Sequence, residues 1–495
     1  MNGKMHHGMR EWKEDDECVW KFEGYWKEFD APACPWFSSG QPLSYRDVSD
    51  HSKITTSVPH GYGTLYFPET GSWVKPEGYR NYTGQFERGK PIGHAFIHMR
   101  EENTIYDGDT KDGLPHGKGK IISQGNVVYE GDFFESKKHG VGTEYILRGS
   151  QKGVYTGDFK ENKRCGHGVL KWKRSRGNPD AFTLEGEWRD GQPLCGKMTY
   201  NDGGTYTGGF GNNMQRNGQG VMIYPGGRKY DGAWKDNMKH GRGMFSNADG
   251  TETYAGEYEN NVKHGRGLYT VDGNRYVGMF QNDRMHGRGV IMWAYGGTYD
   301  GDFRNGKPNG RGVDTRPDGA TYTGEFRNGW PDGRGVEMSP SGTYDGDFRD
   351  GKAHGHGVHT SSDGATYTGE FRNGEPNGRG VKTNLGATYN GAFMKGKPHG
   401  RGVYTSPDGA TYDGYWTNGK QNGHGVWTGA DGSTYDGEFK DDKKHGHGVF
   451  TYASGNIYDG GWEDGKKHGL GVYTYSDGRK FDGKWLHGDR ITPKT

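Results

Sequence analysis

The sequence predicts an all-β protein, an elongated and twisted antiparallel ribbon of β-hairpins with a period of about 23 residues. Three observations lead to this fold class. Glycine contributes 93 of the 495 residues, whereas ordinary proteins contain about 7%. Aromatic residues are abundant, with 32 Tyr, 21 Phe and 14 Trp, so we expect a thin core made of rings. A short motif, Tyr-x-Gly-x-Phe or Tyr-x-Gly-x-Trp, recurs at nearly constant spacing.

The recurrence divides residues 82–495 into about 18 repeats, a periodicity typical of solenoids and other repeat arrays. Their first residues are Tyr82, Tyr106, Tyr129, Tyr155, Leu184, Tyr206, Tyr230, Tyr254, Tyr276, Tyr299, Tyr322, Tyr344, Tyr367, Tyr389, Tyr412, Tyr435, Tyr458 and Phe481. One interval is longer than the others, and residues 173–179 within it are expected to form a loop insertion.

Each repeat is predicted to be one hairpin. The Tyr, Gly and Phe of the motif alternate with polar residues, so they lie on one face of a first strand. A later Gly-x-Gly-Val run indicates a second strand, and Asp-Gly pairs such as Asp318-Gly319, Asp408-Gly409 and Asp431-Gly432 favour tight turns. We hypothesise that the Gly-x-Gly positions lack side chains so that neighbouring rings can lie over the backbone.

Stacking such hairpins would bury a continuous row of rings that no repeat could bury alone. Four consecutive repeats show the expected core residues, which are Tyr299, Gly301, Phe303, Tyr322, Gly324, Phe326, Tyr344, Gly346, Phe348, Tyr367, Gly369 and Phe371.

The full pattern, Tyr-x-Gly-x-Phe/Trp followed by Gly and then His-Gly-x-Gly, resembles the MORN repeat, and the resemblance covers residues 82–495. It implies an elongated, twisted antiparallel ribbon. Residues 1–81 depart from the pattern and are expected to hold a partial or split repeat. Phe22–Trp26 resembles a first strand and His60–Gly63 a second one, with a loop-like insertion between them that contains Pro32, Pro35, Ser38, Ser39 and Gly40.

Composition argues against several classes of protein. The 64 basic and 63 acidic residues nearly balance, so the excess of Lys and Arg that nucleic-acid binding requires is missing. No apolar run approaches the ~20 residues of a transmembrane helix. The four cysteines, Cys18, Cys34, Cys165 and Cys195, form no paired motif, which is typical of reduced thiols in the cytosol.

Three recurring patterns could carry chemistry, and each has a structural interpretation that we prefer. Gly-x4-Gly-Lys, as at Gly301 to Lys307, lacks the Ser or Thr of a phosphate loop. The recurring histidines stand one repeat apart, too far to share a metal ion. The carboxylates and arginines form stripes that would pair across a solvated sheet face. The sequence therefore predicts no catalytic, cofactor or metal site. The histidines are His116, His139, His240, His264, His286, His354, His399, His445 and His468, and the stripes are Asp302, Glu325, Asp347, Glu370 and Glu438 with Arg288, Arg311, Arg334, Arg379 and Arg401.

Only 15 residues follow from Phe481 onward, which leaves no room there for the enzymatic domains that some MORN proteins carry. The resemblance then implies a non-enzymatic scaffold that docks other proteins. Its closest analogy is to structural components of the ciliary or flagellar axoneme such as the radial spoke head. The alternative is a cortical cytoskeletal scaffold that binds anionic phospholipid through Lys307, Lys352, Lys397, Lys420, Lys443, Lys444, Lys466 and Lys467.

The last repeat is expected to act as an assembly edge. Phe481 and Trp485 belong to a first strand that lacks the Gly-x-Gly-Val partner of the preceding repeats. An open strand edge presents unpaired backbone groups, which proteins either cover or pair with another chain. A second copy or another spoke-head subunit could add a strand here, as MORN proteins that dimerise end to end do.

Overall fold

The computed structural model describes residues 5–14, 18–29, 45–46, 54–67, 78–148, 151–173 and 181–491. The chain forms two compact units, Met1–Gly250 with Tyr258–Asn261, and Thr251–Glu257 with Val262–Thr495. Both are antiparallel β-sheet, and the single helical turn in the described ranges is η1 (Asn212–Met214). The all-β prediction is confirmed.

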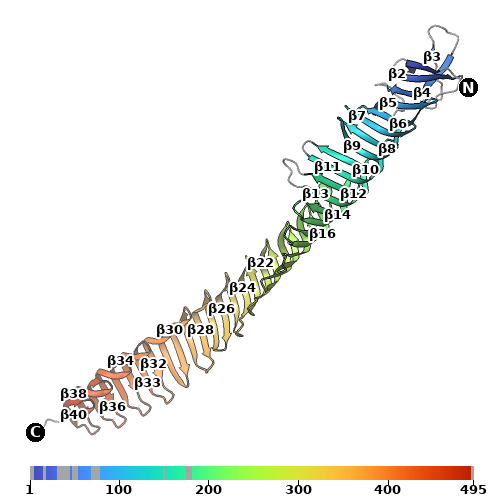
Figure 1. The fold of residues 1–495 in the computed structure, drawn as a ribbon. Helices are drawn as coiled ribbons and strands as arrows, with labels where there is room; N and C mark the ends of the chain where they lie inside the picture. Colours follow the sequence, from blue (N-terminus) through green and yellow to red (C-terminus); the bar gives the residue numbers. More distant parts are fainter. Residues whose placement is uncertain are drawn as a thin grey trace. The chain divides into compact units, whose positions relative to one another are not determined.

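Strands follow one another in chain order, and within each compact unit neighbouring strands pair antiparallel (Figure 1). Before residue 250 they are β1 (Met5–Glu14), β2 (Cys18–Phe29), β3 (Tyr45–Arg46), β4 (Ile54–Tyr66), β5 (Tyr79–Glu87), β6 (Lys90–Met99), β7 (Thr104–Lys111), β8 (Leu114–Ser123), β9 (Asn126–Phe134), β10 (Lys137–Arg148), β11 (Gln151–Lys160), β12 (Lys163–Lys173), β13 (Phe182–Arg189), β14 (Gln192–Tyr200), β15 (Thr205–Phe210), β16 (Arg216–Ile223), β17 (Lys229–Lys235) and β18 (Met238–Ser246). After it come β19 (Glu252–Glu259), β20 (Val262–Val271), β21 (Asn274–Gln281), β22 (Arg284–Met292), β23 (Thr298–Arg304), β24 (Lys307–Thr315), β25 (Thr321–Arg327), β26 (Trp330–Ser339), β27 (Gly342–Arg349), β28 (Lys352–Ser361), β29 (Thr366–Arg372), β30 (Glu375–Asn384), β31 (Ala387–Met394), β32 (Lys397–Thr405), β33 (Thr411–Thr417), β34 (Lys420–Thr428), β35 (Thr434–Lys440), β36 (Lys443–Thr451), β37 (Ile457–Glu463), β38 (Lys466–Thr474), β39 (Lys480–Leu486) and β40 (Asp489–Ile491).

One repeat is one hairpin, as β23 and β24 illustrate. Asn305 and Gly306 join the two strands, and both have positive φ, 52° and 84°. Two consecutive positive φ angles are the mark of the type I′ turn, which suits the twist of a hairpin and favours Asn-Gly. The next hairpin begins after a turn in which Gly319 takes a φ of 86°. The Asp-Gly turns predicted from the sequence therefore separate the repeats.

The tyrosine that opens each repeat covers a pair of glycines. Gly301 on β23 lies opposite Gly312 on β24, and the buried ring of Tyr299 lies over both. A Cβ atom added to Gly312 would stand 2.5 Å from this ring. The Tyr299 hydroxyl donates a hydrogen bond to the backbone carbonyl of Asp302, at 2.9 Å. The hypothesis that the Gly-x-Gly positions make room for rings is thus correct for Gly312, and the same contact extends to Gly301 of the first strand.

The first glycine of Gly-x-Gly has a different role, which the hypothesis missed. Gly310 has a φ of 101°, a conformation that side chains rarely tolerate. The register shifts next to it, between Gly301 and Phe303, because β24 carries two extra residues there in a β-bulge. Only the second glycine is required by contact with the ring.

The rings interlock from one repeat to the next. The Tyr299 ring meets Phe303 of its own repeat at 5.1 Å and Phe326 of the next at 4.8 Å, both edge to face. Such pairs contribute about 0.5–1.5 kcal/mol beyond their burial. The structure buries every ring expected in the four central repeats, which are Tyr299, Phe303, Tyr322, Phe326, Tyr344, Phe348, Tyr367 and Phe371.

In the N-terminal region β2 pairs with β4, and Gly24 lies opposite Gly63, as the glycines of later hairpins do. β4 also pairs with β5, which places Leu65 opposite Tyr82. The insertion with Pro32, Pro35, Ser38, Ser39 and Gly40, and the loop expected at residues 174–179, lie outside the described residues.

One repeat carries a natural exception to the glycine pair. Ala95 stands opposite Gly84, where other repeats have the second glycine. The ring of Tyr82 is still buried, but its hydroxyl lies 3.0 Å from the hydroxyl of Thr110 and not against its own strand. The repeat that carries a methyl group at this position, in Ala95, is thus one in which the tyrosine hydroxyl is displaced.

We predict that Gly312→Ala destabilises its hairpin by about 1–3 kcal/mol, the usual cost of overpacking. The Tyr299 ring has to move away from the new Cβ atom and loses its bond to Asp302. Hydrogen exchange should speed up in β23–β25 and stay unchanged in distant repeats, because each repeat contacts only its neighbours.

The matched control is Ala95→Gly, which removes a methyl group at the equivalent position and should leave exchange in β5–β7 nearly unchanged. Wild-type protection of β23–β25 in the Gly312→Ala variant would contradict the proposed contact.

Candidate interaction surface

The sheet of the second compact unit has two chemically different faces. We call the face that carries the Tyr and Phe rings the ring face. The residues between them, such as Asp300, Asp302 and Arg311, lie on the opposite side, which we call the charged face. Successive residues of a strand alternate between the faces, so each repeat contributes to both.

On the charged face, ion pairs link neighbouring strands. The side chains in these ion pairs are about half exposed or more. Exposed ion pairs stabilise the folded state by about 0–1 kcal/mol each. The arginine stripe therefore behaves as a solvated sheet face. The pairs are Arg288–Asp300 at 3.1 Å, Arg334–Asp345 at 2.7 Å and Arg401–Asp413 at 3.6 Å.

The predicted carboxylate stripe has a further role. Asp302 accepts a hydrogen bond from the backbone N–H of Arg311, at 3.3 Å. Asp347 and Glu370 accept the corresponding N–H groups of His356 and Arg379, at 3.2 Å each. These carboxylates hold the β-bulge of their hairpin, which explains why they recur once per repeat.

The Gly-x4-Gly-Lys pattern falls on the hairpin turn. Gly306 and Lys307 end the turn from β23 into β24, with no helix after it. The backbone N–H of Gly306, which a phosphate would need, donates to the carbonyl of Met285 in the preceding repeat, at 2.9 Å. The same bond recurs at Gly329, Gly351, Gly374, Gly396, Gly419, Gly465 and Gly488.

The ring face carries one position per repeat whose chemistry changes. This position is the residue after Val in Gly-x-Gly-Val. On each neighbouring strand the residue opposite it is the Tyr or Phe that opens a repeat. Asp314, for example, lies opposite Tyr299 and Tyr322. These side chains are half-buried, except for Lys382, which is exposed. We call this set the variable row, and it consists of Ile291, Asp314, Glu337, His359, Lys382, Tyr404, Trp427, Phe450 and Tyr473.

The variable row changes in blocks along the chain. Asp314 and Glu337 form an acidic block, which binds Arg316 through pairs of 3.8 and 2.7 Å. Burial raises the pKa of Asp314. A hollow of about 520 Å³ opens beside Asp314, lined by Trp293, Tyr295 and Arg316 among others. His359 and Lys382 follow as a basic block, and the last four members are aromatic.

The aromatic block encloses Lys444, which the sequence analysis counted among the lysines that could bind anionic phospholipid. The ammonium of Lys444 lies 3.9 Å from the ring centroid of Phe450 and 4.9–5.3 Å from those of Trp427, Tyr435 and Trp462. Burial lowers the pKa of this amine to about 8, while the ring faces attract the charged form and oppose the shift.

Lys467 occupies the equivalent place one repeat later, between Tyr452, Tyr458, Tyr473 and Trp485 at 4.7–5.2 Å. Both lysines precede the His-Gly of their repeat, where several other repeats, such as those with Pro308 and Pro398, have Pro. In the sequence, these two lysines occur in repeats whose variable-row residue is aromatic. This combination indicates that a cation is enclosed by rings.

In the structure, the predicted C-terminal edge is partly covered. Trp485 is buried against Tyr458 of the preceding repeat, with ring centroids 5.3 Å apart, and Arg490 lies 3.1 Å above the ring of Phe481. β39 is not a lone strand, because β40 pairs with Lys484–Leu486. Among the described residues, the outer side of Lys480–Gly483 has no strand beside it.

The recurring histidines predicted from the sequence do not converge on a common point. The structure does bring one of them, His468, into contact with a histidine outside that set, His487. Within the described residues, a single group of three metal-ligating side chains converges, Glu463, His468 and His487. The sequence analysis missed His487 because it stands in a hairpin turn, not before the Gly-x-Gly run. No helix in the described part of the chain has the length and apolar character to cross a membrane.

Comparison with known protein families supports the repeat assignment. The family described as "MORN repeat" matches seventeen segments that together span more than half of the chain, and a search of curated proteins found no match. The matches include residues 58–72, where the sequence analysis placed the second strand of a split repeat, and omit the repeats that begin at Tyr82 and Phe481. The remaining segments are 106–126, 129–146, 155–174, 185–193, 206–227, 230–252, 254–275, 276–298, 299–321, 322–343, 344–366, 367–383, 389–411, 412–434, 435–457 and 458–478. The chain therefore belongs to the MORN-repeat family.

Proposed function

We propose that this protein is a non-enzymatic scaffold that docks other structural proteins along the variable row, in a ciliary or flagellar axoneme and most specifically in a radial spoke head. One observation carries the docking proposal. The buried rings hardly change from repeat to repeat, whereas the half-buried residues between them change from acidic to basic to aromatic. A constant core with a graded surface suits a scaffold that receives different partners at different repeats.

The repeated architecture also supports a structural role in preference to catalysis. An active site needs a unique pocket in which a few polar groups converge. The charged face instead repeats the same ion pairs, and its carboxylates are used to hold bulges. The axonemal assignment is a separate step, and it rests on the resemblance of a chain made of MORN repeats to radial-spoke-head proteins.

Several of the lysines that would serve the alternative, a lipid-binding cortical scaffold, have partners within the protein. Lys420 pairs with Asp441 at 3.3 Å, and Lys443 pairs with Asp464 at 3.5 Å. Lys444 lies among aromatic rings, as does Lys467. Attraction to an anionic membrane requires a cluster of basic residues, so these contacts favour protein docking over lipid binding.

We predict that the tagged full chain stays with detergent-extracted axonemes of ciliated cells, and that Lys382→Glu reduces this retention several-fold. Lys382 lies in the exposed part of the variable row, where a reversed charge would repel an acidic partner. The matched control is Arg379→Glu on the same strand, which makes the same change on the charged face and should leave retention unaltered.

Three results would count against this proposal. Wild-type protein in the soluble fraction would contradict the axonemal assignment. Equal effects of the two variants would contradict docking through the variable row. Salt-sensitive sedimentation with anionic phospholipid vesicles would favour the lipid-binding alternative.

We also propose that the outer side of Lys480–Gly483 pairs with a strand of another chain, either a second copy or a spoke-head subunit. Three-residue β40 covers only the other half of β39, and an uncovered strand favours pairing. Sedimentation velocity of the purified full chain should show a concentration-dependent dimer if a second copy is the partner. A monomer at every concentration, together with no binding to purified spoke-head proteins, would contradict this role.

A further inference from the structure

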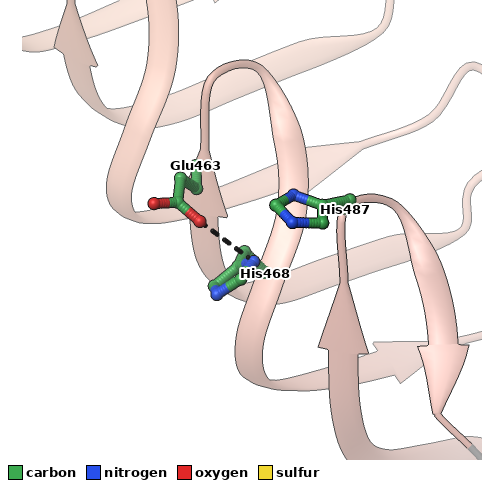
Figure 2. Close-up of side chains that lie close together, drawn as sticks. All are labelled: Glu463, His468 and His487. Carbon is green, nitrogen blue, oxygen red and sulfur yellow. Dashed lines mark ion pairs between the residues drawn. The ribbon is translucent and has the colours of Figure 1, made fainter.

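We propose that Glu463, His468 and His487 bind a divalent transition-metal ion of the Zn²⁺ class at the junction of the last two repeats. Figure 2 shows the three side chains together, with the carboxylate of Glu463 directed at the ring of His468 and His487 beside it. One ligand atom from each residue lies within 4.8 Å of the other two. Oε2 of Glu463 is 3.1 Å from Nδ1 of His468, and the two histidine rings are 5.3 Å apart.

The repeat architecture builds this niche. Glu463 ends β37, and His468 lies on β38 after the two-residue turn that follows. His487 occupies the first turn position of the next hairpin, with a φ of 48°. The backbone N–H of Gly488 donates to the carbonyl of Lys467, at 2.9 Å, and this bond holds the turn beside His468. The same backbone bond recurs at the preceding junction, between Gly465 and Lys444, at 2.9 Å.

Two other junctions fill the three positions with residues that do not form three metal ligands. The preceding junction has Lys440, His445 and Asp464, in which an ammonium replaces the carboxylate. The junction three repeats before the proposed site has Met394, His399 and Asn418. The convergence of three ligands is therefore a feature of the side chains at this junction and does not follow from the repeat alone.

The donor set and its surroundings fit zinc. Imidazole nitrogen and carboxylate oxygen bind Zn²⁺ at about 2.0–2.2 Å, which places tetrahedral ligands roughly 3.4 Å apart. The side chains of Glu463 and His468 are 46% and 34% exposed, and His487 is exposed, so small rotations can bring the three donors this close. Three protein ligands leave one position for water.

Nδ1 of His468 is buried from solvent without a hydrogen bond, as are those of His399 and His445, but at this junction the nitrogen also lies 3.1 Å from a carboxylate oxygen of Glu463. A buried nitrogen without a hydrogen bond is unfavourable. An ion between the carboxylate and the ring would satisfy both groups.

A metal here would cross-link β37 and β38 to the turn between β39 and β40. We expect the metal-free full chain to bind one equivalent of Zn²⁺ in isothermal titration calorimetry, with slower hydrogen exchange confined to residues 458–491. His487→Asn should weaken this step by more than about tenfold, the lower bound seen even for loss of a second-shell partner. Asn is the residue found at this turn position in other repeats, so the variant should fold.

His445→Asn is the matched control, because it removes the equivalent histidine of the preceding junction and should leave the titration unchanged. Glu463→Gln, which keeps the shape of the side chain, should also weaken binding. Equal Zn²⁺ binding by wild type and His487→Asn, or protection spread evenly over the chain, would overturn the proposal.

Discussion

The contact between a tyrosine ring and a pair of cross-strand glycines, which recurs in most repeats, is the constraint on which the rest of this structure depends. The ring can lie flat only where neither strand carries a Cβ atom, as at Gly301 and Gly312. This contact fixes the register of the hairpin and aims the hydroxyl at a backbone carbonyl. It also sets the ring where the phenylalanines of two repeats can meet its faces. The cross-strand glycines and the aromatic residues therefore have a common cause, while other glycines serve turns and bulges.

Local sequence signals predicted the hairpins well. Alternation placed Tyr299 and Phe303 on one face, and Asp-Gly and Asn-Gly pairs marked the turns, because both signals act within a few residues. Features that depend on neighbouring repeats were missed. The enclosure of Lys444 needs rings from three repeats, and the convergence of His468 with His487 needs the bond between two hairpins. The two glycines of Gly-x-Gly looked equivalent in sequence, yet one serves a bulge and the other a ring.

If the variable row docks partners as we propose, stability and recognition are carried by different residues. Rings and glycines are shared by nearly all repeats and lie inside, whereas the variable row is reached from solvent between them. Substitutions in the variable row would then alter what a repeat binds without disturbing the hairpin, except where a side chain such as Phe450 also encloses a lysine. The proposed metal junction is a similar case. Three positions that occur in other repeats would bind a metal ion there because of their side chains alone.

An alkaline titration of tyrosine absorbance, compared between the native and urea-unfolded chain, tests the central claim most directly. Burial raises the pKa of Tyr322, Tyr344 and Tyr367 to about 12, above the value of about 10 for an unfolded chain. Because the native state resists losing these protons, folding stability should be intact below pH ~10 and fall as the pH rises toward 12. The account predicts that much of the native absorbance change is displaced to higher pH and coincides with loss of the β-sheet circular dichroism. Native and unfolded curves that coincide, with the sheet intact, would contradict it.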